Sequence, residues 1–152
     1  MNFELDTYDR KIIALLQENA RLSYTDLGRR IHLSSPAVTE RVRRLEDAGV
    51  ITGYRACVNL RKIGYSFEAL VQVTVTSHAA LDSWTKTHPE VLACHATTGN
   101  HCALLRIAIT QPEHLQELLL SLAEIGQTST SIVLSSHHEE RAKRAADEIA
   151  LG

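Results

Sequence analysis

Residues 23–45, SYTDLGRRIHLSSPAVTERVRRL, constrain the fold most strongly, because their spacing predicts two short helices joined by a tight turn. Ser23 followed by Asp26 is typical of a helix start. Leu27 and Ile31 are four residues apart and therefore share one face of that helix. Gly28 lies inside it, which favours close packing against another segment. We expect the turn at residues 32–34.

The second helix of the pair carries most of its charge as arginine. Ser34 or Ser35 can cap it, and Pro36 fits the first turn, where no backbone N–H is needed. Its apolar stripe consists of Val38, Val42 and Leu45. A rotation of about 100° per residue then places Pro36, Thr39, Glu40, Arg43 and Asp47 outward, with Arg44 on the flank. Arg41 lies closer to the stripe, where we expect an intramolecular ion pair or a phosphate contact.

This arrangement predicts a helix-turn-helix that reads the major groove of DNA with its second helix. Thr39 and Arg43 are expected to face the groove, and the two serines to lie near phosphates at the helix N-terminus. Glu40 has the chemistry to accept a hydrogen bond from a cytosine amine. The candidate DNA-binding residues are Ser34, Ser35, Pro36, Thr39, Glu40, Arg43 and Arg44. An ordinary helical hairpin is the alternative interpretation of the same stretch.

The segments on either side favour DNA binding. Residues 5–19 predict a third helix, capped by Asp6. Gly49 suits the left-handed position after the end of the arginine-rich helix. Residues 50–60 (VITGYRACVNL) predict a strand, a turn at Gly53 and a second strand. Three helices followed by a β ribbon make a winged helix-turn-helix.

The rear half predicts a β-α-β-β-α-β order, which is a ferredoxin-like α+β domain. Strands are expected at 65–76, 91–98, 102–110 and 128–136, helices at 77–88 and 112–124, with Gly126 ending the second helix. Residues 137–151 are expected to form a surface helix. Two helices cover only one face of the sheet, yet the strands are apolar on nearly every residue. A partner sheet is the simplest cover, so we expect at least a homodimer.

Charge divides the chain into a basic front and an acidic rear. Residues 1–62 contain 11 Lys and Arg against 8 Asp and Glu, and residues 63–152 contain 5 against 10. This split favours DNA binding confined to the front. We expect a DNA-binding domain at 1–50, a β-ribbon linker at 51–64, and an oligomerisation and effector domain at 65–152.

Cysteine usage and hydropathy indicate the compartment. The chain has three cysteines, Cys57, Cys94 and Cys102, and its start is polar rather than a secretory signal. No apolar run approaches the ~18 residues that a membrane span needs. We therefore expect free thiols in the cytoplasm and no membrane partner.

The chain resembles the Lrp/AsnC regulators over roughly residues 5–140. The features that carry the resemblance are Asp6 and Asp9, Asn19-x-Arg21-x-Ser23, Leu33-Ser34, Glu40-Arg41-Val42, Leu45-Glu46, Gly49-x-Ile51, Lys62-x-Gly64 and Thr97-Thr98-Gly99. The resemblance implies a bacterial or archaeal transcription regulator that binds double-stranded DNA. It also implies dimers joined through the rear sheet, their assembly into octamers, and an amino acid bound between dimers.

The effector residues follow from this resemblance and from the polar residues around its glycine. A buried amino acid needs partners for its ammonium and carboxylate groups. The candidates are Thr98, Gly99, Asn100, His101, Cys102, Gln127, Thr128 and Ser129. Cys102 stands where leucine-responsive members usually carry a carboxylate, so leucine specificity does not transfer simply. An ordinary polar turn without a ligand is the alternative.

Two other functions stay open, and no cofactor is expected. One is an architectural protein that binds DNA with little sequence preference, and the other is a tetrapyrrole decarboxylase built on the same fold. Fold alone does not set function, and the arginine-rich helix favours DNA. Cys94, His95, His101 and Cys102 invite a zinc interpretation, but neighbours along a strand point to opposite faces and cannot all converge. We therefore expect no metal site and no enzymatic activity.

Overall fold

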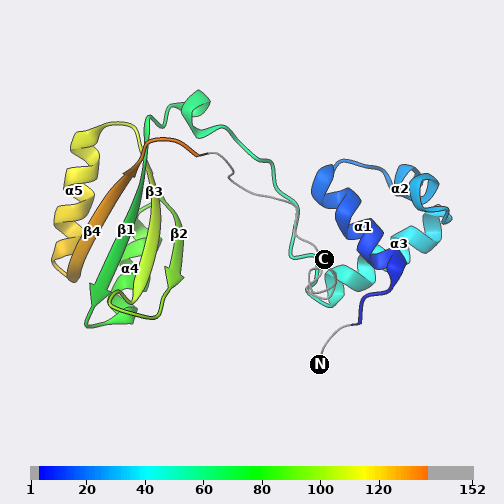
Figure 1. Cartoon of the computed structure of the whole chain (residues 1–152), viewed down its shortest axis with the longest axis horizontal. Coiled ribbons are helices and arrows are strands. Elements are labelled where there is room, and N and C mark those ends of the chain that lie inside the picture. The colour runs from blue at the N-terminus through cyan, green and yellow to red at the C-terminus, as the bar shows by residue number, and fades with distance from the viewer. Residues whose placement is uncertain (1–3, 137–152) are drawn as a thin grey trace. The chain divides into compact units, whose positions relative to one another are not determined.

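The computed structural model describes residues 4–136, which form two compact units that divide between Ala56 and Cys57 (Figure 1). The division falls inside the segment 51–64 that the sequence assigns to a linker. The limits expected from the sequence, at residues 50 and 64, stay a prediction.

The first unit is built from three helices around one apolar core. These are α1 (Thr7–Glu18), α2 (Tyr24–Ile31) and α3 (Ser35–Asp47). Asp6 and Asp9 form a reciprocal capping box at the start of α1, and Ser23 caps α2 by accepting from the backbone of Asp26 at 3.1 Å. The buried residues are Ile12, Leu16, Leu27, Ile31, Val38, Val42 and Leu45, as the helical spacing predicts.

The turn between α2 and α3 depends on a close backbone approach. A Cβ on Gly28 would lie 2.4 Å from the carbonyl oxygen of Leu33, so only glycine fits there. His32 takes the left-handed conformation at φ 60°, and Ser34 then caps α3. Gly49 takes φ 68° just after α3, which confirms its predicted place at the helix end.

The β ribbon predicted at residues 50–60 is wrong for this chain. Val50 and Ile51 donate their backbone N–H groups to the Leu45 carbonyl, and residues 52–59 then run without helix or strand to a short 3-10 turn, η1 (Leu60–Ile63). Tyr54 donates its hydroxyl to Glu46 of α3 at 2.9 Å. The β-branched residues of this segment suit a strand, but the described part of the chain offers them no strand to pair with.

The second unit is a four-stranded antiparallel sheet with two helices. Its elements are β1 (Phe67–Val75), α4 (His78–Thr87), β2 (Val91–Ala96), β3 (Ala103–Ile109), α5 (Pro112–Ala123) and β4 (Gly126–Val133). The strand order is β2-β3-β1-β4. This order and the alternation of elements confirm the predicted ferredoxin-like α+β class. Gly126 was expected to end the second helix, but α5 ends at Ala123 and Gly126 opens β4. A Cβ there would lie 2.5 Å from the Thr74 carbonyl oxygen of β1, so the close strand approach needs glycine.

Both helices cover the same face of this sheet (Figure 1). Their core consists of Ala69, Val71, Val73, Leu81, Trp84, Ala103, Leu105, Ile107, Ile109, Leu115, Leu118 and Leu122. The opposite face carries Leu70 and Leu104, but also Gln72, Ser129 and an ion pair in which Arg106 Nε donates to Glu68 at 2.9 Å. The expectation that the strands are apolar on both faces is therefore too simple, because the open face is mixed.

Two further predictions meet the limits of the description. The surface helix expected at 137–151 lies outside the described residues. Within residues 4–136, none of the helices has the length and apolar character to cross a membrane.

Candidate nucleic-acid interface and effector site

The outward face of α3 is fixed by what the helix buries. Val38, Val42 and Leu45 have no exposed surface, so the positions on the opposite side of the helix must face away from the core. Thr39, Glu40 and Arg43 are exposed there, and Pro36 is exposed in the first turn. The predicted groove-facing residues thus share one side of α3.

Most side chains on this face make only weak contacts with the rest of the protein. Arg43 is 81% exposed, and its nearest carboxylate, Asp47, lies 3.7 Å away. Exposed pairs of this kind contribute little, so the guanidinium can exchange this partner for DNA. The hydroxyl of Thr39 donates to the Ser35 carbonyl at 2.9 Å, while Ser34 accepts from the backbone of Ala37 at 3.4 Å. Ser34 and Ser35 lie at the helix N-terminus, where backbone N–H groups favour anions.

The two other arginines of α3 turn toward α1. Arg41 Nη1 donates to Asp9 Oδ1 at 2.9 Å and also contacts Asp6, which confirms the intramolecular pairing expected for it. Arg44 Nη2 donates to Asp9 Oδ2 at 2.5 Å, although its side chain is still 49% exposed. Arg44 is therefore more closely bound to the protein than the sequence indicated. The sequence offered one hint of this, the spacing of Asp6 and Asp9.

The electrostatics of this cluster stabilise its charged forms. Burial alone would raise the pKa of Asp6, but hydrogen bonds from the backbone of Asp9 and from Arg41 outweigh it and lower that pKa. The same hydrogen bond to Asp6 raises the pKa of Arg41 despite partial burial. The Arg41 guanidinium also lies 5.3 Å from the centre of the Tyr8 ring.

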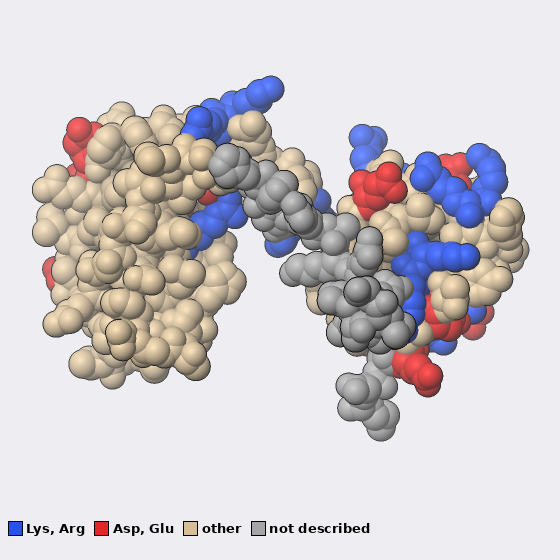
Figure 2. Space-filling view, in the orientation of Figure 1, with Lys and Arg blue, Asp and Glu red and all other residues tan. Residues whose placement is uncertain are grey.

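Charge is distributed unevenly over the molecular surface. Figure 2 shows blue and red side chains gathered over the three-helix unit, whereas the sheet unit is largely uncharged in this view. Most of the charged side chains visible in this view thus belong to the same unit as the arginine-rich α3.

Three of the candidate effector residues, Asn100, His101 and Gln127, lie around Thr74 near the end of β1. The hydroxyl of Thr74 donates to the Asn100 carbonyl at 3.1 Å and lies 3.2 Å from His101 Nδ1. Thr74 also stands opposite Gln127 in the pairing of β1 with β4. Sequence analysis missed Thr74, although the alternation of apolar and polar residues along β1 places it on the face away from the helices.

The structure separates some of the candidates that the sequence grouped. Gln127 and Ser129 lie opposite Thr74 and Gln72 on the open face, whereas Thr128 lies opposite the buried Val73 on the helix side. Thr98 and Gly99 are exposed in the β2–β3 loop, where Gly99 takes φ 106°. A single ligand on the open face can therefore contact Gln127 and Ser129 together, but not the hydroxyl of Thr128.

Cys102 is engaged by the backbone of β1. Its thiol donates to the Val73 carbonyl and accepts from the Val75 N–H, both at 3.3 Å. The thiol is therefore less available to a ligand than its place in the sequence suggested.

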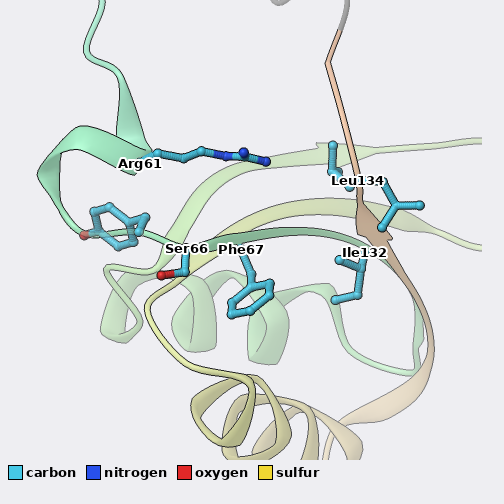
Figure 3. A pocket seen from close by; sticks show the side chains of 7 residues that line it. Arg61, Ser66, Phe67, Ile132 and Leu134 are labelled. Carbon is cyan, nitrogen blue, oxygen red and sulfur yellow. The ribbon is translucent and has the colours of Figure 1, made fainter.

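One hollow lies at the other end of the sheet. It is an open groove of about 410 Å³ lined by Arg61, Tyr65, Ser66, Phe67, Ile132, Val133 and Leu134. Figure 3 shows Phe67 and Ile132 side by side beneath the Arg61 side chain. None of the candidate effector residues lines it. Nowhere in residues 4–136 do three or more His, Cys, Asp or Glu side chains gather closely enough to hold a metal ion.

Comparisons with known proteins agree with this division into two units. Residues 5–52 match the family model for winged helix-turn-helix DNA-binding domains, and residues 68–143 match the Lrp/AsnC ligand binding domain. The HTH-type transcriptional regulator LrpC of Bacillus subtilis is 34% identical over 134 residues, covering 87% of this chain and 93% of LrpC.

Solved structures extend the likeness to the whole fold. The structure of Bacillus subtilis LrpC covers 88% of this chain and 97% of its own, with a TM-score of 0.85 at 34% identity. A transcriptional regulator of Neisseria meningitidis in complex with L-Met covers 95% of this chain and 99% of its own, with a TM-score of 0.87 at 27% identity. Both domain matches and the identity to LrpC over most of its length lead to one conclusion: the chain belongs to the Lrp/AsnC family of transcription regulators.

Proposed function

We propose that this protein regulates transcription by placing α3 in the major groove of a specific DNA sequence. The observation that carries the proposal is the exposed side of α3, which lies opposite its fully buried stripe. Thr39, Glu40 and Arg43 would contact base edges, and Arg44 would contact a flanking phosphate. Ser34, Ser35 and Pro36 would set the helix N-terminus against the backbone of the DNA.

Specific recognition can be separated from mere DNA coating. We would sequence the fragments that the full-length protein retains from a genomic pool at moderate salt, then compare its affinity for the enriched sequence and for random DNA at that same salt concentration. A specific regulator should prefer its site by at least about 10³-fold. Equal affinity for both would favour the architectural alternative, and no binding to either would reject DNA recognition altogether.

We further propose that a small amino acid binds at the end of β1, between the β2–β3 loop and β4. Support comes from relatives solved with methionine, namely the Neisseria meningitidis regulator and the feast or famine regulatory protein of Mycobacterium tuberculosis. Gly99, Asn100 and His101 would present polar groups from the loop, with Gln127 and Ser129 completing the site from β4. Thr98 would lie beside these groups in the loop, whereas Thr128 faces the helix side and the thiol of Cys102 is already bonded to β1.

A thermal-shift screen of the twenty amino acids tests the effector. A ligand at about 100-fold excess over its Kd stabilises the native state by roughly 2.7 kcal/mol. At least one amino acid, with methionine the first to try, should raise the melting temperature of the wild type. The shift should be absent in Gly99→Val, because valine is strained at φ 106°. Absence of any shift, with no change in oligomer size, would identify a regulator that works without an effector.

We propose that the protein is at least a homodimer and, like other members of its family, an octamer. The sheet face away from α4 and α5 supports this proposal, because it leaves Leu70 38% exposed in the middle of a strand. Light scattering at micromolar concentration tests the assembly, and a stable monomer would refute it.

We also infer that binding, rather than catalysis, is the activity, and that the protein works in the cytoplasm, where chromosomal DNA lies. The relatives are named as transcriptional regulators, which supports both inferences. An absorbance scan of the purified protein for a bound tetrapyrrole would expose the decarboxylase alternative.

A further inference from the structure

Asp9 is the one charged side chain that is fully buried among residues 4–136, and two arginines of α3 share it. Its Oδ1 atom accepts from Arg41 Nη1 at 2.9 Å, and its Oδ2 atom accepts from Arg44 Nη2 at 2.5 Å. The Oδ2 atom also accepts the backbone N–H of Asp6 at 3.1 Å. The carboxylate therefore links the first turn of α1 to the middle of α3.

The two arginines are not equivalent. Arg41 is 26% exposed and is held from several sides, by Asp9, by Asp6 and by the face of Tyr8. Arg44 is 49% exposed and lies next in sequence to the exposed Arg43, one rotation of about 100° around α3. Arg44 Nη2 thus contacts Asp9, while the half-exposed side chain of Arg44 lies at the border of the DNA-facing surface.

We propose that Asp9 is a positioning residue for DNA binding: its buried carboxylate fixes the Arg44 guanidinium at the edge of α3, where the half-exposed Arg44 side chain meets a DNA phosphate. The planar fork of arginine can bridge two oxygen acceptors, which a point charge does less well. A guanidinium held in place before DNA arrives loses less conformational freedom on binding. This inference rests on the proposed DNA-binding role of α3.

Charge alone predicts the opposite effect, which makes the proposal testable. Removing a carboxylate near DNA should strengthen binding to the polyanion through the general field of the protein. Asp9→Asn keeps the size of the side chain and one acceptor oxygen but removes the charge. We expect it to weaken binding to the enriched site by tenfold or more. Asp47→Asn is the matched control, since it removes an exposed carboxylate beside Arg43 and should leave affinity equal or higher.

The salt dependence of binding shows whether Asp9 acts through Arg44. Each phosphate contact contributes about 0.9 to the slope of log K against log salt concentration. Both Asp9→Asn and Arg44→Ala should lower that slope by about one, measured on full-length protein at a temperature where circular dichroism shows each variant folded. The double variant should bind no more weakly than Arg44→Ala alone. A purely structural role for Asp9 would lower the melting temperature and leave the slope unchanged.

Three results would overturn the proposal. A folded Asp9→Asn protein with wild-type or tighter binding would do so, as would an unchanged affinity and salt slope in Arg44→Ala. If Asp9→Asn does not fold, Arg44→Lys decides, because lysine keeps the charge but lacks the planar fork. It should bind several-fold more weakly, and wild-type affinity would reject the bridging role. Failure of the wild type to prefer any DNA would reject the proposed function instead.

Discussion

The three-helix unit and the sheet unit differ in how completely each buries its apolar residues and pairs its charged side chains. In the first, the arginines of α3 that face inward find carboxylates on α1, and the apolar stripe of α3 is fully buried. In the second, two helices cover one sheet face and leave the other open, with Leu70 exposed in mid-strand. The comparison leads us to expect that the three-helix unit is complete by itself, while the sheet unit pairs its open face with a second copy of the chain.

The largest expected effects come from emptying each core in turn. Leu45 and Leu105 are fully buried in the first and second units. Leu45→Ala and Leu105→Ala should each cost about 2–5 kcal/mol of unfolding free energy. The chain's single tryptophan, Trp84, lies in α4, so its fluorescence reports the second unit, while far-UV circular dichroism reports both. The unfolding transition followed by Trp84 fluorescence should therefore shift only in Leu105→Ala. A shift of the fluorescence transition by Leu45→Ala would mean that the units unfold as one.

Charging the open sheet face should break assembly without unfolding the sheet. Leu70→Glu would place a carboxylate at the centre of the expected contact between subunits, where it would be desolvated without a partner. Sedimentation should show a dimer Kd raised by at least tenfold. Leu120→Glu is the control, since Leu120 is 64% exposed on α5, which lies on the covered face. Unchanged assembly in Leu70→Glu would place the interface elsewhere.

The exposed side of α3 predicts a smaller and more selective loss. Arg43→Ala should cost about 1–3 kcal/mol of binding free energy on the preferred site if Arg43 reads a base. Affinity for random DNA should then change less, whereas a phosphate contact would weaken both equally. Arg29→Ala removes an exposed arginine of α2 as the control. Fluorescence anisotropy on both DNA types measures the difference, and wild-type values for Arg43→Ala would remove it from the interface.

The smallest expected effect is the acid sensitivity of the α1–α3 contact. Hydrogen bonds from the Asp9 backbone and Arg41 overcome burial and hold the pKa of Asp6 below 3.8, its ordinary value. A depressed native pKa stabilises the fold above the unfolded pKa and loses that contribution as the pH falls through the native pKa. The first unit should therefore weaken below about pH 3.8, and Asp6→Asn should reduce this dependence. Melting temperatures of the wild type and of Asp6→Asn, measured from pH 6 to pH 2, would show this difference. The same dependence of melting temperature on pH in both proteins would contradict the prediction.

Much of the architecture could be predicted because it depends on local rules. Helical spacing located the buried stripe of α3, and Gly28 and Gly49 marked a close approach and a helix end. The β-α-β-β-α-β order followed from alternating patterns that each element shows by itself. The β ribbon was wrong because strand formation needs a pairing partner, which propensity alone does not supply.

The candidate sites were predicted less completely, because they join residues that are far apart in sequence. Thr74 connects the β2–β3 loop with β4, yet nothing local marks it among the polar residues of β1. Likewise, the placement of Thr128 on the helix side depends on strand register. Its neighbours Gln127 and Ser129 have similar chemistry and a different face.

The sequence by itself determined which helix can read DNA, where its apolar stripe lies, and that the rear half is a ferredoxin-like sheet, since helical and strand periods are written in neighbouring residues. Only the tertiary structure decided that Arg44 pairs with the buried carboxylate of Asp9, which lies 35 positions away in the sequence. A charge can be buried only where opposite charges meet it, and that meeting is a property of packed helices, not of any one segment.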